Sequence, residues 1–387
     1  MINGKNLVAG NWESQSDSIK FQTINPKTQE ALAIDFQQAT SDQISRALEA
    51  ASESFELVAA LRLTDRIRFL ECIQKEMQLI QSEIIATYQM ESALAEGRAN
   101  GEFQRTMDQI QRFIELLQKG NFVKASLHTG GPDLRKMLYP IGPVVVFGAS
   151  NFPLAFSTAG GDTISAFAAA CPVVVKAHPY HAGTSELVAQ AITKAVEKCK
   201  LPKGIFSHLG GQSHDIGSKL VSNPLVKGVG FTGSFSGGKA LYDLAQQRAE
   251  PIPVFAEMGS INPIFILEAK LKSDRSLAEA IAQSVTLGTG QFCTTSSERS
   301  LPMQGTCARS SGDLLASIFV MPRMDCAGTI RPSTALRSYC GSLRCRLASV
   351  VTVPLVPRSR RSPCSAAGPI RLAKSEKLSR TTLRIFA

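Results

Sequence analysis

The chain has 387 residues, of which 44% are hydrophobic, and a formal net charge of +10 at pH 7, so it is long enough for two or three domains. It contains no apolar run of the roughly 18 residues that a membrane span needs, and its first ten residues lack the apolar core of a secretory signal. We therefore expect a cytoplasmic protein without a membrane partner. Its 9 cysteines should be free thiols, and their spacings form no paired zinc motif, so no metal site is expected.

The basic charge is confined to the end of the chain. Residues 299–387 hold 15 Lys and Arg against 3 Asp and Glu, whereas the preceding 298 residues hold 27 against 29. This last segment is rich in Ser, Arg, Pro and Cys and shows no sustained helical or strand period, which predicts a low-order tail. Its arginine run, Arg358 to Arg361, lacks interleaved aromatic residues and supports only non-specific contact with nucleic acid.

The first 120 residues predict short strands followed by helices. Residues 8–12 and 21–24 have the composition of strands separated by turns. A capping signal at Thr40 precedes the first of three segments with apolar residues at helical spacing, which are residues 41–54, 63–95 and 99–117. We therefore expect a helical N-terminal layer.

The pattern of predicted secondary structure changes at Pro140, where strands begin to alternate with helices. Short apolar runs bounded by Gly or Pro predict strands at residues 144–147, 173–175, 205–209, 228–231, 254–258 and 263–267. Helical patterns occupy residues 158–170, 185–199, 214–222, 240–247 and 277–286. This alternation predicts an α/β fold with a doubly wound parallel sheet.

A cysteine near the end of this region has unusual neighbours. Cys293 lies in the stretch Gly-Thr-Gly-Gln-Phe-Cys-Thr. A lone cysteine in such a protein is often only a small buried hydrophobic residue. The glycines, however, would leave the thiol open to substrate, and a thiolate there could attack a carbonyl carbon.

Two further polar residues are candidates for chemistry. Glu257 stands between apolar neighbours in Phe-Ala-Glu-Met-Gly, so we expect it to be poorly hydrated, as suits a general base; a solvated or ion-paired Glu is the alternative. Asn151 follows a predicted strand in Gly-Ala-Ser-Asn-Phe-Pro. It could serve the turn alone or donate its amide to an oxyanion.

A glycine-containing loop and a lysine follow other predicted strands. Residues 232–238, Thr-Gly-Ser-Phe-Ser-Gly-Gly, join a strand to a helix, where backbone N–H groups can bind phosphate. The loop lacks the G-x-G-x-x-G spacing, and alone it is also typical of a tight turn. Lys176 ends an apolar strand, a place where a lysine is commonly just solvated.

The order of these features resembles the aldehyde dehydrogenase superfamily over about residues 10–294. The stretches Phe-Gly-Ala-Ser-Asn-Phe-Pro and Lys-Ala-His-Pro look most like the α-ketoglutaric semialdehyde dehydrogenase (2,5-dioxovalerate dehydrogenase) branch. The resemblance implies oxidation of an aldehyde to a carboxylate with NAD(P)⁺ through a cysteine thiohemiacetal and thioester. The aldehyde would be a carboxylate-bearing semialdehyde such as 2,5-dioxopentanoate.

The resemblance also implies roles for individual residues. Cys293 would be the nucleophile, Glu257 the base that activates water, and Asn151 an oxyanion donor beside the backbone N–H of Cys293. Lys176 would reach the adenosine ribose. The pyrophosphate would lie near Gly233, Ser234 and Gly237.

His178 bears on the choice of nucleotide. Members of the family that prefer NAD often carry a carboxylate at this position, two residues after the lysine. Because His178 would not repel a 2′-phosphate, the resemblance favours NADP, with NAD left open.

The resemblance implies an incomplete catalytic domain. We expect residues 1–257 to form the helical layer and the NAD(P)-binding Rossmann-like domain, residues 258–298 the start of the nucleophile-bearing domain, and residues 299–387 an unrelated tail. The family's later Glu-(Ile/Val)-Phe-Gly-Pro motif does not occur in that tail. The alternative function is therefore an inactive truncated or frameshifted product that retains at most nucleotide binding. Members of the family form homo-oligomers, which we do not expect of this chain.

Overall fold

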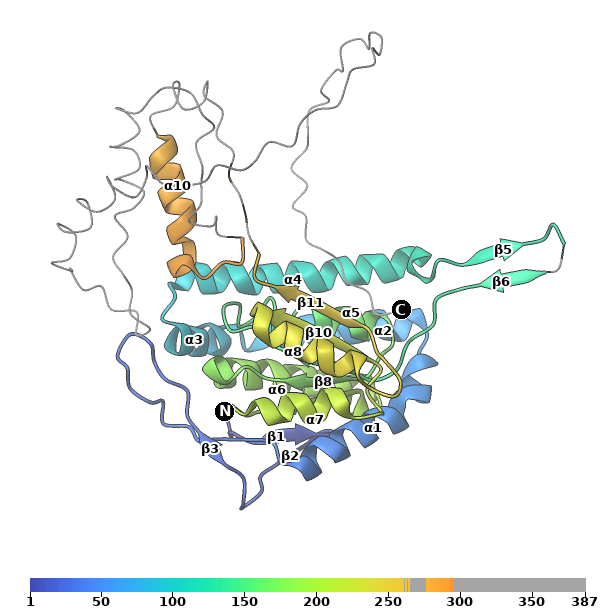
Figure 1. Ribbon diagram of the computed structural model, residues 1–387, viewed down its shortest axis with the longest axis horizontal. Helices are drawn as coiled ribbons and strands as arrows, with labels where there is room; N and C mark the ends of the chain where they lie inside the picture. The colour runs from blue at the N-terminus through green and yellow to red at the C-terminus, as the bar shows by residue number, and fades with distance from the viewer. Residues whose placement is uncertain (132, 261, 263, 265–275, 295–387) are drawn as a thin grey trace, which may run out of the picture. The chain divides into compact units, whose positions relative to one another are not determined.

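The computed structural model describes residues 1–131, 133–260, 262, 264 and 276–294. Its central element is a seven-stranded sheet with the order β11-β10-β7-β8-β9-β1-β2 (Figure 1). The strands of this sheet are β1 (Asn6–Val8), β2 (Asn11–Glu13), β7 (Val144–Phe147), β8 (Val173–Lys176), β9 (Phe206–Leu209), β10 (Gly228–Gly233) and β11 (Val254–Met258). Strands β7 to β11 run parallel, and β1 joins β9 and β2 in antiparallel pairs.

The parallel strands have doubly wound topology, as predicted. The chain builds β7, β8 and β9 outward in one direction, then returns to place β10 and β11 on the other side of β7. The strand order therefore reverses between β7 and β10, and this switch point is where open α/β sheets bind ligands. Phe147 pairs with Lys176 and with Phe231, so the carboxyl ends of these strands meet at one edge.

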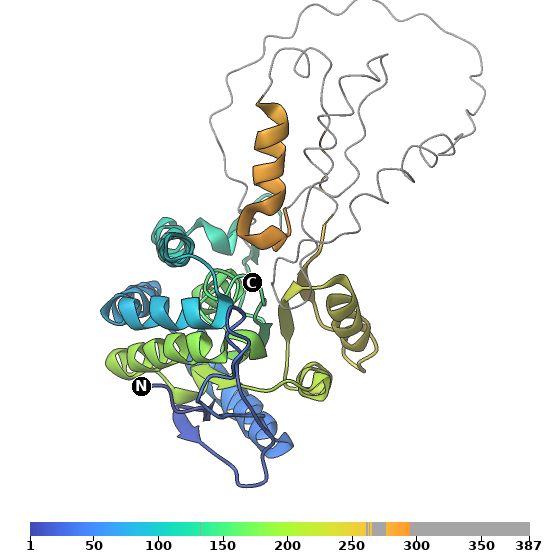
Figure 2. The same ribbon diagram turned by 90° about the vertical axis from the view of Figure 1, so that its left-hand side faces the viewer.

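Both faces of the sheet are buried at β7, β8 and β9, which explains why β7 and β8 read as continuous apolar runs. Val144 and Val146 contribute to one hydrophobic core, whereas Val145 and Phe147 contribute to the other, because successive side chains point to opposite faces. Helices cover both sides (Figures 1 and 2). One core includes residues of α2 (Leu63–Leu79), α3 (Gln81–Ser92), α4 (Glu96–Lys119), α5 (Gly161–Ala168) and α6 (Ala182–Cys199). The other includes residues of α1 (Ser41–Ala59), α7 (His214–Ser222) and α8 (Phe235–Gln246).

The N-terminal helices follow the predicted pattern with one correction. The start of α1 is fixed by a capping box, in which the backbone N–H of Gln43 donates to Thr40 Oγ1 at 3.3 Å and the backbone N–H of Thr40 donates to Gln43 Oε1 at 3.1 Å. The single helix predicted over residues 63–95 is instead two, α2 and α3. They are separated at Ile80, whose φ of −118° is not helical. Apolar spacing continues across Ile80, so the break is invisible in the pattern.

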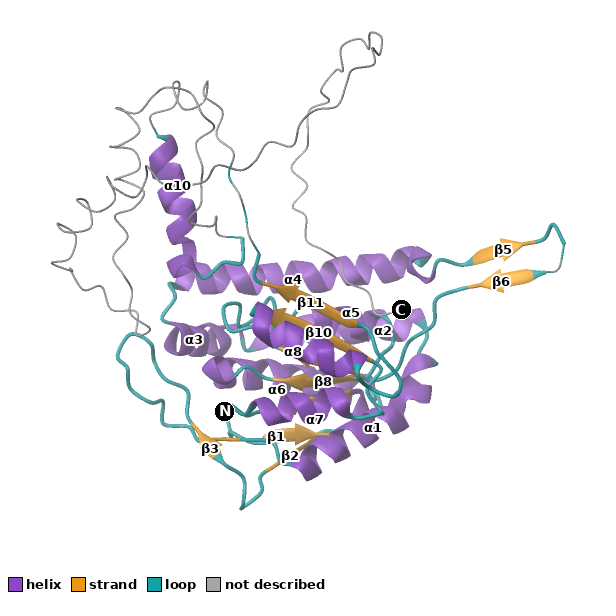
Figure 3. Cartoon of the chain, in the orientation of Figure 1, coloured by secondary structure: helices purple, strands orange, loops and turns teal. Residues whose placement is uncertain are grey.

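Local turns account for the other differences (Figure 3). The strand predicted at residues 8–12 is a hairpin, because Ala9 and Gly10 have φ values of 46° and 80°. The strands β3 (Lys20–Phe21) and β4 (Phe36–Gln37) pair with each other, as do β5 (Ser126–His128) and β6 (Leu134–Lys136), which project as an arm.

The predicted strand at residues 263–267, apart from Ile264, and the tail at residues 299–387 lie outside the described residues. Among the helices of the described part, none has the length and apolar character needed to cross a membrane.

Candidate active site

The predicted site residues gather at the carboxyl edge of the parallel strands. Lys176 ends β8, Gly233 ends β10, and Glu257 is the penultimate residue of β11. Asn151 lies in the turn that follows β7, and Cys293 follows the helix α10 (Leu277–Thr286) and the short helix η4 (Leu287–Gly290). This edge includes the β7/β10 switch point.

Asn151 is in direct contact with the segment that carries Cys293. Its Nδ2 atom donates a hydrogen bond to the carbonyl oxygen of Gln291 at 2.5 Å. The rings of the following residues, Phe152 and Phe292, pack edge to face with centroids 5.1 Å apart. Because an amide nitrogen carries two hydrogens, Asn151 retains a second donor.

The backbone of Cys293 is held by two residues that follow β11. Ser260 Oγ and Asn262 Nδ2 donate to the Cys293 carbonyl at 2.6 and 2.8 Å. Cys293 itself is half-buried. Sequence reasoning missed Ser260 and Asn262, although the polar residues of Gly-Ser-Ile-Asn-Pro directly after a predicted strand were a signal. These bonds connect the end of Glu257's strand to the cysteine segment.

The expectation that Glu257 would be poorly hydrated is wrong. Its side chain is exposed. The apolar neighbours Ala256 and Met258 do not cover it, because side chains one residue away in a strand point to the opposite face. Among the described strands β11 pairs with β10 alone and lies at the end of the sheet.

The loop between β10 and α8 forms the start of a helix. Ser234 is the N-cap of α8, and its Oγ accepts the Gly237 backbone N–H at 3.2 Å. The helix begins at Phe235, five residues before the predicted start, so the first-turn N–H groups point to the sheet edge. A Cβ on Gly233 would come within 2.7 Å of the Phe231 ring, so a larger residue there would require that ring to move.

Lys176 ends β8 and His178 follows two residues later; both side chains are poorly solvated. Lys176 Nζ donates to the Gly211 carbonyl at 2.7 Å, and burial lowers the pKa of Lys176 to about 8. The ring of His178 stacks on that of His181 with centroids 5.6 Å apart. Burial, together with the charges of His181 and Lys176, lowers the pKa of His178 to about 3, so His178 is neutral at pH 7.

Helix α4 anchors the turn that carries Asn151, which the sequence did not predict. The Glu102 side chain is buried, with 2% of its surface exposed. Its Oε1 atom accepts the backbone N–H groups of Leu154 and Ala155 at 2.9 and 3.0 Å, and its Oε2 atom accepts the Tyr88 hydroxyl at 2.8 Å. Arg98 pairs with the same carboxylate at 3.3 Å.

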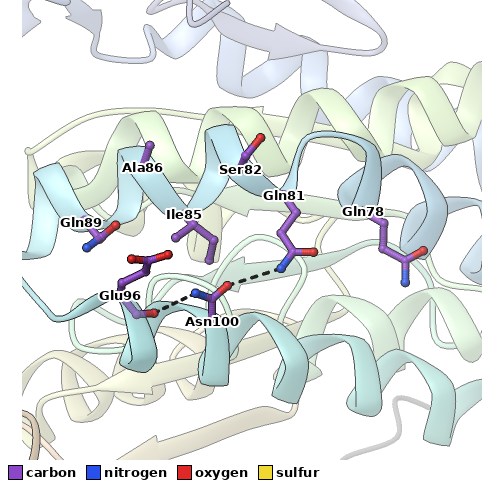
Figure 4. A pocket seen from close by; sticks show the side chains of 8 residues that line it. All are labelled: Gln78, Gln81, Ser82, Ile85, Ala86, Gln89, Glu96 and Asn100. Atoms are coloured by element: carbon purple, nitrogen blue, oxygen red, sulfur yellow. Dashed lines mark hydrogen bonds between the residues drawn. The ribbon is translucent and has the colours of Figure 1, made fainter.

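A separate groove of about 580 Å³ lies between α3 and α4 (Figure 4). Its lining is largely polar and includes none of the predicted site residues. It consists of Gln78, Gln81, Ser82, Ile85, Ala86, Gln89, Glu96 and Asn100. Within it, Gln81 Nε2 donates to Asn100 Oδ1 at 3.4 Å, and Asn100 Nδ2 donates to the Glu96 carbonyl at 3.2 Å.

Comparison with known proteins identifies the family of the chain. A sequence model of the aldehyde dehydrogenase family matches residues 12–304. The chain therefore belongs to the aldehyde dehydrogenase family, which confirms the family predicted from the sequence.

Curated relatives narrow the resemblance to one branch. The chain is 47% identical over 265 residues to alpha-ketoglutaric semialdehyde dehydrogenase 2 of Azospirillum brasilense, covering 66% of this chain and 50% of the relative. It is 40% identical over 301 residues to alpha-ketoglutaric semialdehyde dehydrogenase of Acinetobacter baylyi, covering 76% of this chain and 57% of the relative. The chain thus spans about half the length of the curated relatives that it matches.

Solved structures share the fold at lower identity. A NAD-dependent benzaldehyde dehydrogenase from Corynebacterium glutamicum superposes with a TM-score of 0.71 at 22% identity, covering 90% of this chain and 74% of that chain. A mutant of aldehyde dehydrogenase C from Pseudomonas syringae, complexed with NAD⁺ and octanal, gives 0.70 at 20% identity, covering 81% and 61%. These matches confirm the predicted α/β aldehyde dehydrogenase fold.

Proposed function

We propose that this chain oxidises a carboxylate-bearing semialdehyde, such as 2,5-dioxopentanoate, to the carboxylate with NAD(P)⁺. The single observation that carries the proposal is the contact between Asn151 and Gln291, because it places an amide donor beside the segment of Cys293 at the switch point of the sheet. The substrate class follows from the relatives named alpha-ketoglutaric semialdehyde dehydrogenases.

The chemistry that we propose divides into two stages on Cys293. In the first, the Cys293 thiolate attacks the aldehyde carbon, and the second amide N–H of Asn151 and the backbone N–H of Cys293 stabilise the developing oxyanion. Bound NAD(P)⁺ supplies the acceptor for the hydride, which leaves a thioester. In the second, Glu257 takes a proton from water, the water attacks the thioester, and the carboxylate product departs as the thiol is restored.

The residues at the sheet edge fit a dinucleotide. The first turn of α8, with Gly233, Ser234 and Gly237, would receive the pyrophosphate, since helix N-termini favour anions. The Lys176 ammonium would bond to the adenosine ribose. His178 is neutral and places no negative charge there, so we propose NADP as the preferred nucleotide, with NAD as the alternative.

A second candidate function is nucleotide binding without turnover. It is favoured by the finding that the family match ends at residue 304, while the curated relatives are about twice as long as the matched region. The nucleotide residues all precede that point.

One experiment separates the two candidates. The purified chain and its Cys293→Ala variant are titrated with NADPH and NADH by fluorescence, and each is assayed for reduction of NADP⁺ and NAD⁺ by semialdehyde. Oxidation by the parent chain that is lost in Cys293→Ala, with nucleotide binding unchanged, is the result expected of the proposed enzyme. Binding without oxidation in the parent establishes the second function, and a chain that neither binds nor oxidises contradicts both.

A further inference from the structure

One face of α4 carries two arginines directed at the turn of Asn151. Arg98, Glu102 and Arg105 are spaced four and three residues apart, which places them on the same side of a helix. Glu102 binds the backbone of this turn at Leu154 and Ala155, so the face is fixed against the site.

The two arginines lie against aromatic rings that adjoin the predicted catalytic residues. The Arg98 guanidinium carbon is 4.5 Å from the ring centroid of Phe152 and 4.4 Å from that of Phe292. Arg105 is 5.5 Å from Phe152 and 5.0 Å from Phe156. Phe152 follows Asn151 and Phe292 precedes Cys293, so both cations border the place where an aldehyde would react.

Glu102 does not balance the positive charges of both Arg98 and Arg105. Glu102 already accepts three hydrogen bonds, and of the two arginines it pairs with Arg98. Within the described part of the chain, Arg98 Nε is buried without a hydrogen-bond partner, and no carboxylate forms an ion pair with Arg105. The group therefore carries two positive side chains against one carboxylate, an excess of positive charge that favours binding of an anion.

Arg105 is also within electrostatic reach of Cys293. Partial burial lowers the pKa of Arg105; the charges of Glu102 and Cys293 raise it, and those of Arg98 and Arg112 lower it. Arg105 is nevertheless an exposed residue.

We propose that Arg98 and Arg105 form the subsite for the distal carboxylate of the aldehyde substrate. Guanidinium groups bind carboxylates through paired N–H donors, and contacts with the rings of Phe152, Phe156 and Phe292 hold the two arginines in place. The aliphatic part of a short semialdehyde would then lie along the rings while its aldehyde carbon reaches Cys293. The choice of an aldehyde rests on the proposed function, but the preference of the site for an anion does not.

Alkylation of Cys293 tests the subsite without nucleotide or turnover. The rates of modification by iodoacetate, an anion, and by iodoacetamide, its neutral counterpart, are measured on the Cys293 peptide by mass spectrometry. In Arg98→Gln and Arg105→Gln the ratio of the iodoacetate rate to the iodoacetamide rate should fall about fivefold, as expected for loss of one nearby charge. Lys119→Gln, which removes an exposed charge from the last turn of the same helix, should leave this ratio within about twofold of the parent's, because it lies about 21 Å along the helix from Arg105.

Two further measurements distinguish binding from packing. Arg105→Lys retains the charge and should retain most of the rate ratio. In the parent chain 2-oxoglutarate should slow alkylation by iodoacetamide, and its neutral dimethyl ester should not; both arginine-to-glutamine variants should lose this protection. An unchanged rate ratio in Arg105→Gln, or equal protection by the ester, overturns the subsite and leaves the arginines a purely structural role.

The alkylation experiment can fail or succeed independently of the oxidation assay that tests the proposed function. A chain that shows the expected rate ratios but oxidises no aldehyde retains the anion subsite and loses the enzyme assignment. A chain that oxidises semialdehydes with unchanged ratios retains the enzyme and loses the subsite. Circular dichroism of each variant checks that the fold is intact, and Arg105→Lys and Arg105→Gln keep the test decisive if Arg98→Gln does not fold.

Discussion

The side-chain amide of Asn151 donates to the carbonyl of Gln291, two residues before Cys293, across 140 residues of sequence. The bond connects the turn after β7 to the segment after α10. The residue that we propose as an oxyanion donor therefore also positions the segment of Cys293.

Replacing Asn151 by Ala should slow the proposed first hydride transfer by about 10²–10³-fold, the usual loss for one oxyanion donor. Single-turnover production of NAD(P)H, followed by absorbance, measures this step. Asn100→Ala is the matched control, because Asn100 bonds to Gln81 and Glu96 on the helical surface away from the site. A rate for Asn151→Ala within twofold of the parent's would exclude this role.

Replacing Glu257 by Gln should spare the first hydride transfer and block turnover. The exposed position of Glu257 gives water direct access to the carboxylate, and only the second stage needs an activated water. The expected trace is a burst of about one NAD(P)H per site followed by a stalled thioester, which mass spectrometry can detect. Glu250→Gln, in the exposed loop before β11, should turn over normally. Steady turnover by Glu257→Gln at the parent rate would remove Glu257 from the role of base.

Replacing His178 by Glu should shift nucleotide preference from NADP toward NAD. His178 is neutral at pH 7, so the substitution adds a negative charge where the 2′-phosphate would lie and should weaken NADPH binding about tenfold. The ratio of NADPH to NADH dissociation constants, from fluorescence titrations, is the measurement. His214→Glu adds the same charge at an exposed site on α7 and should leave the ratio unchanged. An unchanged ratio in His178→Glu would contradict the assignment of this position.

Replacing Glu102 by Ala should destabilise the protein by about 3–5 kcal/mol, because Arg98 would lose its partner and two backbone N–H groups of the Asn151 turn would lose their acceptor. The free energy of unfolding in urea measures the effect. Glu115→Ala removes an exposed carboxylate from the same helix and should change stability by less than about 0.5 kcal/mol. Equal losses in the two variants would mean that Glu102 does not anchor the turn.

Stability should decline on mild acidification, and His208 should account for part of the decline. His208 is 4% exposed and Nε2 has no hydrogen-bond partner among the described residues. Burial, with the charge of His181, lowers the pKa of His208 to about 3. The unfolded chain, with a histidine pKa of about 6.5, therefore binds a proton that the folded chain does not, so stability present above pH 6.5 is lost as pH falls toward 3.

The contribution of His208 can be measured by its removal. Between pH 7 and pH 5 the urea unfolding free energy of His208→Gln should fall about 2 kcal/mol less than that of the parent chain. His214→Gln, which changes an exposed histidine, serves as the control for general effects of the substitution. The same pH dependence in His208→Gln and in the parent would show that His208 is not the buried neutral group described.

The sequence by itself determined the family, the doubly wound sheet and several element boundaries. Strands β7 and β11 and helices α7 and α10 agree with the prediction to the residue. Their limits are set by local chemistry, such as the glycine and proline that bound Val144–Phe147 and the runs of Val that fill both faces of a covered sheet. The family, too, can be identified from short local stretches such as the one around Cys293. The roles of the individual site residues stay predictions.

Only the tertiary structure decided which of these local features meet. The break at Ile80, the exposure of Glu257 and the bonds from Ser260 and Asn262 to Cys293 are not encoded in any periodicity. The contacts of Arg98 and Arg105 with the rings beside the site were likewise absent from the sequence prediction. The physical reason is that apolar spacing reports which face of one element is buried, whereas contacts between distant segments depend on how several faces pack together.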